Sequence, residues 1–594
     1  MKSSKILAAL LSLTLFFSMS GCTTKDPGNE TGDVKNGLEN VADGSYEGSG
    51  SGHGGDLKLA VTVKDHKITE VSVIEHQETA GISDKPLADL PGLIVDHQSL
   101  AIDTISGATE TSTAILSAAE AALSEAGADI EALKKPIEKE DKTSEVIEKN
   151  VDIVIVGGGV AGLSAAVEAS KSGQNILLIE KTAVLGGSTS LSGGKILAAD
   201  SVFQREQGIV DTPEQFADFL IKLGNGKVNE DKLRMIADHS SANIDWLIEN
   251  GVEFSDVIDT PNPEMTPNRG LNAASGSGQG FITPLAQAAK DAGVEIMMET
   301  RGEKLIVDEN NAVVGVEATQ SNGDKVIINA AAVILATGGY DRNPELKAEY
   351  SPSYADSRTN VGAGNEGDGL IMARDIGAKI IGNDSAIAQI LPYGSAMADL
   401  FTYSGLFVSV QGERFMDESA PRPVRTPIVL RETNAPEFFI ILDDKMSSEN
   451  ITKSIEEGNG FTADTLEDLA AQTGMDAAKL SAAVARYNEL AAKGVDDDFG
   501  KNAELMSSVD SAPYYAIRCT MNTAGTFAGP QTNLKAEVLR EDGSIIQGLY
   551  AAGEVSSGDL IDKEYPGSGT AIQSFVTMGR IAGETAAEYA KANK

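Results

Sequence analysis

The chain has 594 residues, which is enough for several hydrophobic cores and about three or four domains. Its formal net charge of −40 argues against binding to nucleic acid, whose phosphates need Lys and Arg side chains. Its two cysteines provide no disulfide framework, no CxxCH haem attachment and no iron–sulfur ligand set, and we predict no metal site.

Residues 1–21 are predicted to be a lipoprotein signal peptide. Lys2 and Lys5 precede an apolar run that is too short to span a membrane, and small residues lead up to Cys22, the predicted lipidation site. The alternative is an ordinary secretory signal with an incidental cysteine. Both predict an exported protein, and lipidation would hold it at the extracytoplasmic face of the cell membrane. The polar residues 22–39 are expected to form a flexible tether.

Residues 40–130 are predicted to form a small α+β domain. Asp56–Val63 and Lys67–Glu75 alternate apolar and polar residues, as strands do, and the turn of their hairpin lies at Asp65-His66-Lys67. A helical pattern follows over Ala114–Ala126. The charge-rich residues 131–150 are then expected to be a helical linker.

The segment Asp103-Thr104-Ile105-Ser106-Gly107-Ala108-Thr109 lies in this small domain. It is similar to a motif of the covalent FMN-binding domains of exported electron carriers and bacterial redox pumps. In those domains a flavin transferase esterifies the motif's threonine with FMN phosphate. The resemblance implies that Thr109 is the attachment residue, that Gly107 leaves room for the phosphate and that Asp103 belongs to the recognised motif. Thr109 could alternatively be only the first residue of the following helix.

A dinucleotide-binding pattern begins at residue 151. An apolar strand leads into Gly157, Gly159 and Gly162, which fill the three positions of the GxGxxG fingerprint. The first makes a tight turn, the second lets backbone approach a pyrophosphate, and the third lets the helix pack on the strand. Glu180 ends the second strand, where its carboxylate can accept hydrogen bonds from ribose hydroxyls.

Three segments indicate that the dinucleotide bound by this fingerprint is FAD. They are Glu180–Gly194, with its two glycine pairs, Ala336-Thr337-Gly338-Gly339, and Gly548–Glu554. In this order they resemble the flavoproteins of the fumarate reductase and succinate dehydrogenase family over about residues 150–590. The resemblance implies non-covalent FAD, with Glu554 and the backbone at Ala571-Ile572 near the ribityl chain and isoalloxazine. The other residues that it implies at the cofactor are Ala161, Lys181, Gly187, Ser188, Thr189, Gly193, Gly194, Gly338 and Asp368.

The predicted fold class is therefore α/β. We expect a Rossmann-type FAD-binding domain (151–400 and 511–594) with an inserted α+β capping domain (401–510), preceded by the FMN-binding domain and the lipoprotein signal.

The family segment Gly-x-Arg-Phe-x-x-Glu, followed by a proton-donating arginine, reads here Gly412–Glu418 and then Arg422. The resemblance implies that Arg422 supplies a proton to a C=C bond after hydride transfer from the flavin. Because arginine has a high pKa, it would need a proton relay and a site that excludes water. Arg425 is the nearest alternative.

The chain lacks the residues with which fumarate reductases bind two carboxylates. None of its five histidines lies beyond His239, Leu391 stands where the family has a histidine, and the second arginine is missing. In its place is Tyr565-Pro566-Gly567-Ser568-Gly569, a segment similar to that of 3-ketosteroid dehydrogenases. There the tyrosine hydroxyl and the last glycine's N–H bind a ketone oxygen, which implies the same roles for Tyr565 and Gly569.

The sequence thus predicts an exported flavoprotein that reduces the activated C=C bond of an α,β-unsaturated carbonyl compound, preferably an enone such as a 3-oxo-steroid. The expected partners are a membrane electron donor, which passes electrons through FMN to FAD, and a flavin transferase. Fumarate is a poor candidate, because a buried carboxylate without a cation is costly. One alternative is an aryl-acrylate reductase acting on cinnamate or urocanate. Others are a ketosteroid dehydrogenase-type oxidation with Tyr393 or Tyr403 as the base, and an electron carrier without catalysis.

Overall fold

The computed structural model describes residues 37–137, 144–259, 265–396, 400, 405–420, 422–432, 437–563 and 565–593. Within these ranges no helix is both long enough and apolar enough to cross a membrane. The predicted signal peptide and Cys22 lie outside the described residues, as does most of the predicted tether. The last residues of that tether are part of the first domain instead, because Leu38 is fully buried in its core.

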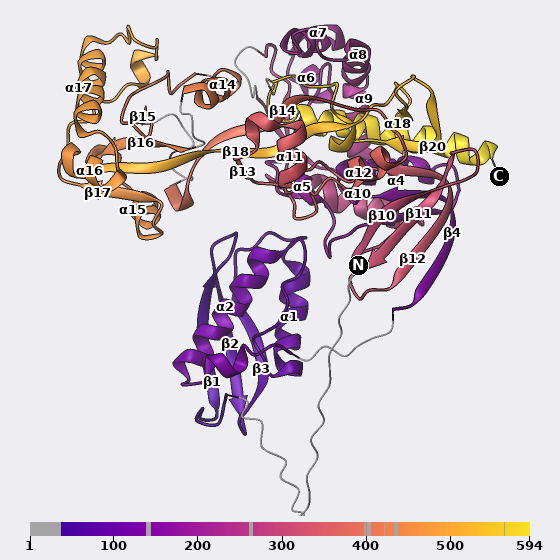
Figure 1. Cartoon of the computed structure of the whole chain (residues 1–594), viewed down its shortest axis with the longest axis horizontal. Coiled ribbons are helices and arrows are strands. Elements are labelled where there is room, and N and C mark those ends of the chain that lie inside the picture. Colours follow the sequence, from indigo (N-terminus) through magenta and orange to yellow (C-terminus); the bar gives the residue numbers. More distant parts are fainter. Residues whose placement is uncertain are drawn as a thin grey trace, which may run out of the picture.

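The N-terminal domain is a three-stranded antiparallel sheet covered by helices (Figure 1). Its elements are β1 (Gly44–Ser51), β2 (Asp56–Lys64), β3 (Lys67–Glu75), α1 (Asp84–His97), α2 (Thr109–Glu125) and α3 (Ile130–Leu133). The predicted hairpin is present, and both Asp65 and His66 at its turn have positive φ, as a tight two-residue turn requires. Helix α2 begins earlier than its apolar pattern indicated, at Thr109.

The expected helical linker over residues 131–150 is wrong at its C-terminal end. Only α3 continues into it, and strand β4 (Val146–Val156) begins at Val146. Residues 146–150 pair in parallel with Lys325–Asn329 of strand β12 (Lys325–Leu335). Their alternating exposure shows a strand that is covered on one face only, which explains why the segment is rich in charge.

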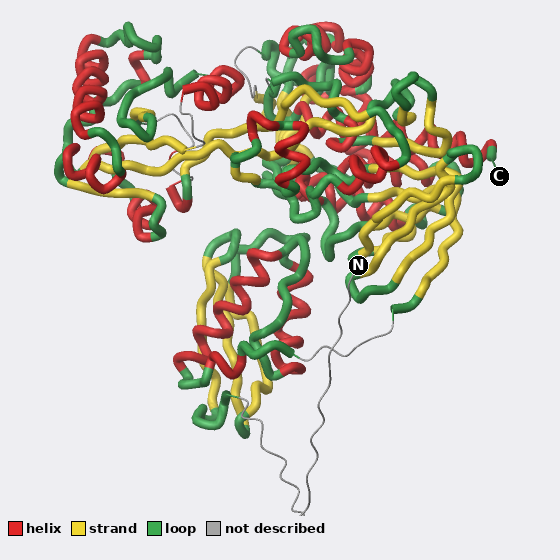
Figure 2. The backbone as a smooth tube through the Cα atoms, viewed as in Figure 1, coloured by secondary structure: helices red, strands yellow, loops and turns green. Residues whose placement is uncertain are grey.

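The FAD-binding core is built on an eight-stranded mixed sheet in which β4 lies between β12 and β5. The other strands are β5 (Ile176–Ile179), β9 (Glu295–Met297), β10 (Thr300–Val307), β11 (Val313–Gln320), β19 (Glu537–Leu539) and β20 (Ile545–Ala551). One face packs against α4 (Val160–Ser170), α10 (Gln279–Asp291) and α18 (Thr570–Ala592). The other packs against α12 (Asp368–Asp375). The central strands of the sheet therefore carry helices on both faces, while at the lower right of Figure 2 strands of the sheet (yellow) extend beyond the helices (red).

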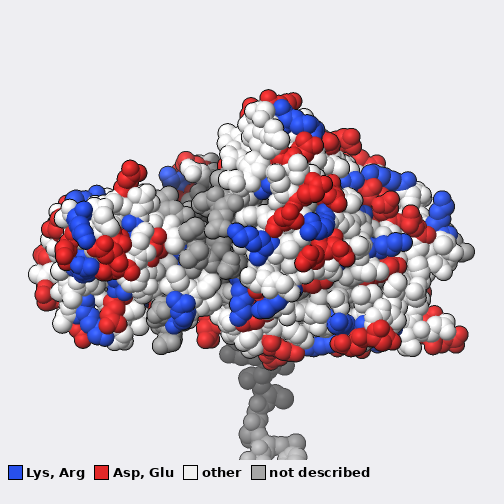
Figure 3. Space-filling model, turned by 90° about the horizontal axis from the view of Figure 1, so that it is seen from above, with Lys and Arg blue, Asp and Glu red and all other residues white. Residues whose placement is uncertain are grey.

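Beside this core lies a smaller antiparallel sheet with five helices. These elements are β6 (Lys195–Leu197), β7 (Phe254–Asp259), β8 (Gly270–Ala273), α5 (Gly187–Ser190), α6 (Val202–Glu206), α7 (Pro213–Leu223), α8 (Glu230–Asp238) and α9 (Ser240–Glu249). Helix α11 (Pro344–Tyr350) follows the core strand β12. Acidic and basic side chains are interspersed over the face seen in Figure 3, so the net negative charge forms no single patch there.

A distal lobe extends from the core on two long strands, β14 (Ile380–Pro392) and β18 (Tyr514–Pro530) (Figure 1). In the sequence, one strand precedes and the other follows residues 401–510, where we predicted the capping domain. The other elements of this part are β13 (Arg358–Thr359), β15 (Leu406–Val408), β16 (Glu437–Asp443), β17 (Gly460–Ala463), α14 (Arg422–Glu432), α15 (Glu449–Glu456), α16 (Leu466–Thr473) and α17 (Ala477–Lys493).

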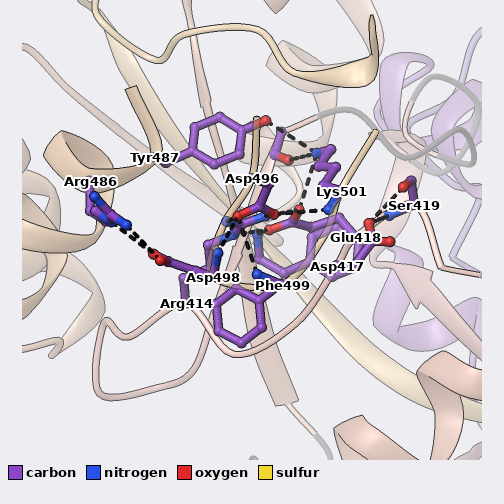
Figure 4. A network of polar contacts seen from close by, with 12 residues as sticks. Arg414, Asp417, Glu418, Ser419, Arg486, Tyr487, Asp496, Asp498, Phe499 and Lys501 are labelled. Carbon is purple, nitrogen blue, oxygen red and sulfur yellow. Dashed lines mark hydrogen bonds and ion pairs between the residues drawn. The ribbon is translucent and has the colours of Figure 1, made fainter. Parts of the chain in front are cut away.

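A buried ion network holds the lobe together (Figure 4). Arg414 donates to both oxygens of Glu418, from Nε and Nη2, at 2.9 Å each, and its Nη2 also donates to Asp496 at 2.8 Å. Lys501 Nζ lies 3.1 Å from Glu418 Oε2. The side chains of Glu418, Asp496 and Lys501 are fully buried. The arginine and glutamate of the family segment are thus structural, and they fix the chain just before Arg422.

Removing one partner from this network is expected to destabilise the protein. Glu418→Ala leaves Arg414 paired with Asp496 alone and removes the carboxylate that pairs with the buried Lys501 ammonium. We expect a loss of about 3 kcal/mol in the free energy of unfolding. The measurement is thermal or denaturant unfolding. The matched control is Arg486→Ala, which removes an exposed pair with Asp498 and should change little. Equal stability of the two variants would contradict the role of the network.

Candidate functional site

A cavity of about 570 Å³ lies at the carboxyl ends of β4, β5 and β12. Its walls come from the glycine turn after β4, the loop after β5, the end of β12 and the start of α18. Residues of the N-terminal domain also line it, including Thr109. Carboxyl ends of parallel strands are where this fold class binds its ligands.

The three fingerprint glycines have the geometry that a dinucleotide requires. Gly157 has φ of +110°, and a Cβ there would clash with the Ala336 carbonyl oxygen. A Cβ on Gly162 would clash with the Gly157 carbonyl oxygen, because α4 packs closely on the turn. A Cβ on Gly159 would meet only Gly186 O, at 3.8 Å, so its backbone faces open space where a pyrophosphate can approach.

Glu180 follows β5 and faces this turn. Its Oε2 accepts from Gly158 N–H at 2.8 Å, and its Oε1 accepts from the Thr182 N–H and hydroxyl, also at 2.8 Å each. The neighbouring Lys181 is paired with Asp368 at 2.7 Å and with Glu366 at 2.9 Å. Glu180, Lys181 and Asp368 therefore line one wall, and the lysine charge there is already neutralised.

Glu554 also lines the cavity. Burial raises its pKa to about 7, although hydrogen bonds from Thr526 N–H (2.8 Å) and the Asn365 amide (3.1 Å) favour the charged form. Asn365 was missed by the sequence reasoning. It is an asparagine in a glycine-rich loop, and only the fold brings its amide to Glu554.

Most of the remaining predicted cofactor residues also line the cavity. They are Ala161, Gly187, Ser188, Thr189, Gly193, Gly338, Ala571 and Ile572. Gly194 lies outside the lining: it has φ of +67°, and a Cβ there would clash with the backbone of Ser277. Gly162, which is likewise outside, supports the wall from behind.

Tyr565 and Gly569 stand together in the cavity wall. The Tyr565 ring is buried and stacks on Phe527 with centroids 6.3 Å apart. Its hydroxyl accepts from the Ala571 N–H at 3.1 Å, which holds it against the first turn of α18. Gly569 precedes that helix with φ of +99°, and a Cβ there would lie 3.0–3.2 Å from the backbone of Ile196.

Two arginines of α14, Arg422 and Arg425, are the candidate proton donors. Arg422 is the first residue of the helix, and its side chain lies outside the described atoms. Arg425 lies near Cys519, whose pKa burial raises and the arginine charge lowers, with a net rise. Arg425 is not among the described residues that line the cavity. The same holds for Tyr393, which donates to Glu437 at 2.7 Å, while Tyr403 lies outside the described residues.

The fingerprint geometry, the cavity and the preceding small domain together define a flavoprotein. Residues 152–572 match the FAD binding domain family and residues 52–124 match the FMN-binding domain family, so the chain belongs to the FAD binding domain family. It is an oxidoreductase whose two domains serve FAD and FMN.

Three comparisons describe its relatives. A fumarate reductase (cytochrome) of Shewanella frigidimarina is 32% identical over 75% of this chain and 78% of its own length. A urocanate reductase of Eggerthella lenta is 29% identical over 98% of both chains. The structure of a 3-ketosteroid-Δ4-(5α)-dehydrogenase from Rhodococcus jostii is 26% identical with a TM-score of 0.62, covering 74% of this chain and 97% of that one.

Thr109 is expected to carry FMN as a phosphoester. The denatured protein, made together with a flavin transferase, should keep one FMN mass, and Thr109→Ala should lose it while retaining FAD. Mass spectrometry of the intact chain and of the peptide containing Thr109 is the measurement. Thr111→Ala, two residues along the same helix, is the control, and an unmodified wild-type peptide would refute the assignment.

Proposed function

We propose that the protein is an exported, lipid-anchored reductase of α,β-unsaturated carbonyl compounds, preferably enones such as 3-oxo-steroids. The observation that carries the proposal is the pair formed by Tyr565 and Gly569 in the cavity wall. The hydroxyl is fixed on α18 and belongs to the segment shared with 3-ketosteroid dehydrogenases. A steroid dehydrogenase is also among the structures to which this chain is similar.

In the proposed reaction, Tyr565, Gly569 and Arg422 each have a separate role. Reduced FAD, if bound in this cavity, would supply the hydride that adds to the β-carbon of the substrate, and negative charge would then develop on the carbonyl oxygen. Tyr565 O–H and Gly569 N–H donate to that oxygen, and one such donor is worth about 3 kcal/mol in the transition state. Arg422 gives a proton to the α-carbon, so that a C=C bond becomes a CH–CH bond.

The described substrate side of the cavity favours an uncharged ligand. Its lining there is Ile387, Gln389, Ala524, Tyr565, Ser568 and Phe575. The lysines of the described lining are already paired, Lys181 with Asp368 and Lys195 with Asp259. A dicarboxylate would therefore have to find its counter-charge elsewhere, which makes fumarate a poor candidate.

Electrons are proposed to reach FAD through FMN on Thr109, supplied by a donor in the membrane. The lipid anchor at Cys22 would keep the chain next to that donor. A covalent FMN also suits an exported protein, because it cannot diffuse away.

An aryl-acrylate reductase is the second candidate. The urocanate reductase that matches this chain over nearly its whole length favours it. In that case Tyr565 and Gly569 would hold one carboxylate oxygen, and a cation of the lobe would face the other. A dehydrogenase with Tyr393 as base is less favoured, because that hydroxyl donates to Glu437.

Arg422→Ala should depress kcat far more than substrate binding, because the proton is delivered in the transition state. Arg422→Lys should also be poor, since an ammonium does not reproduce the reach and fork of the guanidinium. Steady-state kinetics with a reduced viologen donor measures both, and Arg425→Ala is the matched variant. If Arg422→Ala keeps near wild-type turnover, the role passes to Arg425 or to a tyrosine.

Tyr565→Phe should lower kcat/KM for an enone by about a hundredfold, because the developing enolate loses one of two hydrogen bonds. Tyr550→Phe, a buried tyrosine beside the ring of Tyr589, is the control and should keep wild-type kinetics. The melting temperature and FAD content of both variants separate this effect from misfolding.

The same assay decides the substrate class. A neutral enone should show little dependence of KM on salt, whereas a carboxylate held by a cation should bind less tightly as salt rises. The panel is a 3-oxo-steroid, cinnamate, urocanate and fumarate. Efficient reduction of fumarate by the purified protein would overturn the proposal.

A further inference from the structure

The FMN-binding domain contacts the FAD-binding core through its attachment segment. Ala183 N–H, in the loop after β5, donates to the Ser106 carbonyl oxygen at 3.0 Å. Gly107 has φ of +89°, and a Cβ there would lie 2.5 Å from Val184 Cγ2. The loop that carries Glu180 therefore contacts the segment that ends at Thr109, and both line one cavity.

Thr109 lies next to a carboxylate, Glu110, whose partner is a histidine. The next residue, Glu110, accepts from His53 Nδ1 at 2.7 Å. The hydrogen bond to His53 and the nearby charge of Arg342 lower the pKa of Glu110, so it is a carboxylate at neutral pH. An FMN phosphoester on Thr109 would add a second negative charge beside it, and the histidine is already engaged by the first.

Arg342, from the core, lines the same cavity as Thr109, and its charge acts on the neighbouring Glu110. Its Nη2 donates to the Val361 carbonyl oxygen at 2.9 Å and its Nε to that of Gly362 at 3.2 Å. Those carbonyls orient the guanidinium without neutralising it. Within the described part of the chain it forms no ion pair with a carboxylate, although Glu110 and Glu366 lie near enough for its charge to lower their pKa values. Lys181, another cation of the described lining, is held by Asp368 and Glu366.

We propose that Arg342 is a positioning residue that binds the phosphate of FMN on Thr109 and so fixes the FMN-binding domain on the FAD-binding core. The inference rests on the proposed attachment of FMN to Thr109. A guanidinium suits the task because its planar fork matches two phosphate oxygens. Thr109 is also the first residue of α2, and a helix N-terminus favours an anion.

The consequence is that flavinylation itself tightens the contact between the two domains. The flavin of a modified Thr109 then starts from a fixed point on the wall of the FAD cavity. Electron transfer falls steeply with distance, so loosening this contact should slow transfer between the flavins without removing either one.

Hydrogen exchange at the Ala183 amide tests the contact directly. In the flavinylated protein this amide should exchange at least ten times more slowly than in Thr109→Ala. Arg342→Ala should lose most of that protection although its FMN mass and FAD content are unchanged, and Arg342→Lys should lose less. Arg540→Ala is the matched control, because that guanidinium also donates to main-chain carbonyls, of Ile376 and Asn311, and should behave as wild type.

The rate of electron transfer from reduced FMN to oxidised FAD is the second readout, followed by flavin absorbance after rapid mixing with a low-potential donor. We expect at least a tenfold fall in Arg342→Ala. The assay contains no unsaturated substrate. Its result therefore does not depend on whether the proposed substrate class is correct. The inference is overturned if Arg342→Ala keeps the wild-type rate and protection, or if wild-type Thr109 is unmodified. It is also overturned if Arg342→Ala has the same effect on exchange in the Thr109→Ala background, because the arginine would then act without the phosphate.

Discussion

Close packing of backbone around α4 is the constraint on which the flavin site depends. Gly162 brings this helix against the turn at Gly157, where a side chain on either residue would clash. On its other side, Gly579 and Gly583 of α18 let that helix approach until a Cβ on either one would clash with an α4 carbonyl oxygen. The first turn of α18 is thereby fixed relative to the fingerprint. Residues from the two ends of the FAD-binding region thus form one wall.

Strands β14 and β18 connect the FAD-binding core to the lobe. The beginning of β18 pairs with β16 and β17 of the lobe, while most of its remainder pairs with β14 toward the core. Thr526, near its end, donates its N–H to Glu554 in the flavin cavity. Within the lobe, the network of Arg414 fixes the segment that leads to α14. The position of Arg422 thus depends on a strand pair and a buried ion network rather than on helix packing alone.

The sequence predicted what short patterns encode. The glycine fingerprint, the hairpin turn at Asp65-His66 and the order of the FAD segments are local signals, and the fold contains each of them. The linker was wrong because a strand exposed on one face has the same charge-rich composition as a surface helix.

Contacts between segments that are distant in the sequence are not marked by any local sequence motif. Asp496 and Lys501 carry no motif that marks them as partners of Glu418. Arg342 and Val184 acquire their significance only when the FMN-binding domain lies on the core. The candidate site residues could be proposed from the sequence because the family segments contain them, and their roles stay predictions. The residues that join the domains had no segment to identify them.

The cavity is chemically divided along its length, and the division matches a separation of tasks. Toward the FMN-binding domain its lining contains ionisable groups, among them His53 and Glu110, which interact with each other, and Arg342. Toward the lobe the described lining is neutral, with Ile387, Gln389 and Tyr565. Charged groups would suit the first end if, as proposed, an FMN phosphate is attached there. At the second end an unpaired charge would be costly to bury if the substrate is uncharged, as proposed, because such a substrate offers no counter-charge. The hydroxyl of Tyr565 suits that end better, since a neutral donor stabilises charge that appears only as the reaction proceeds.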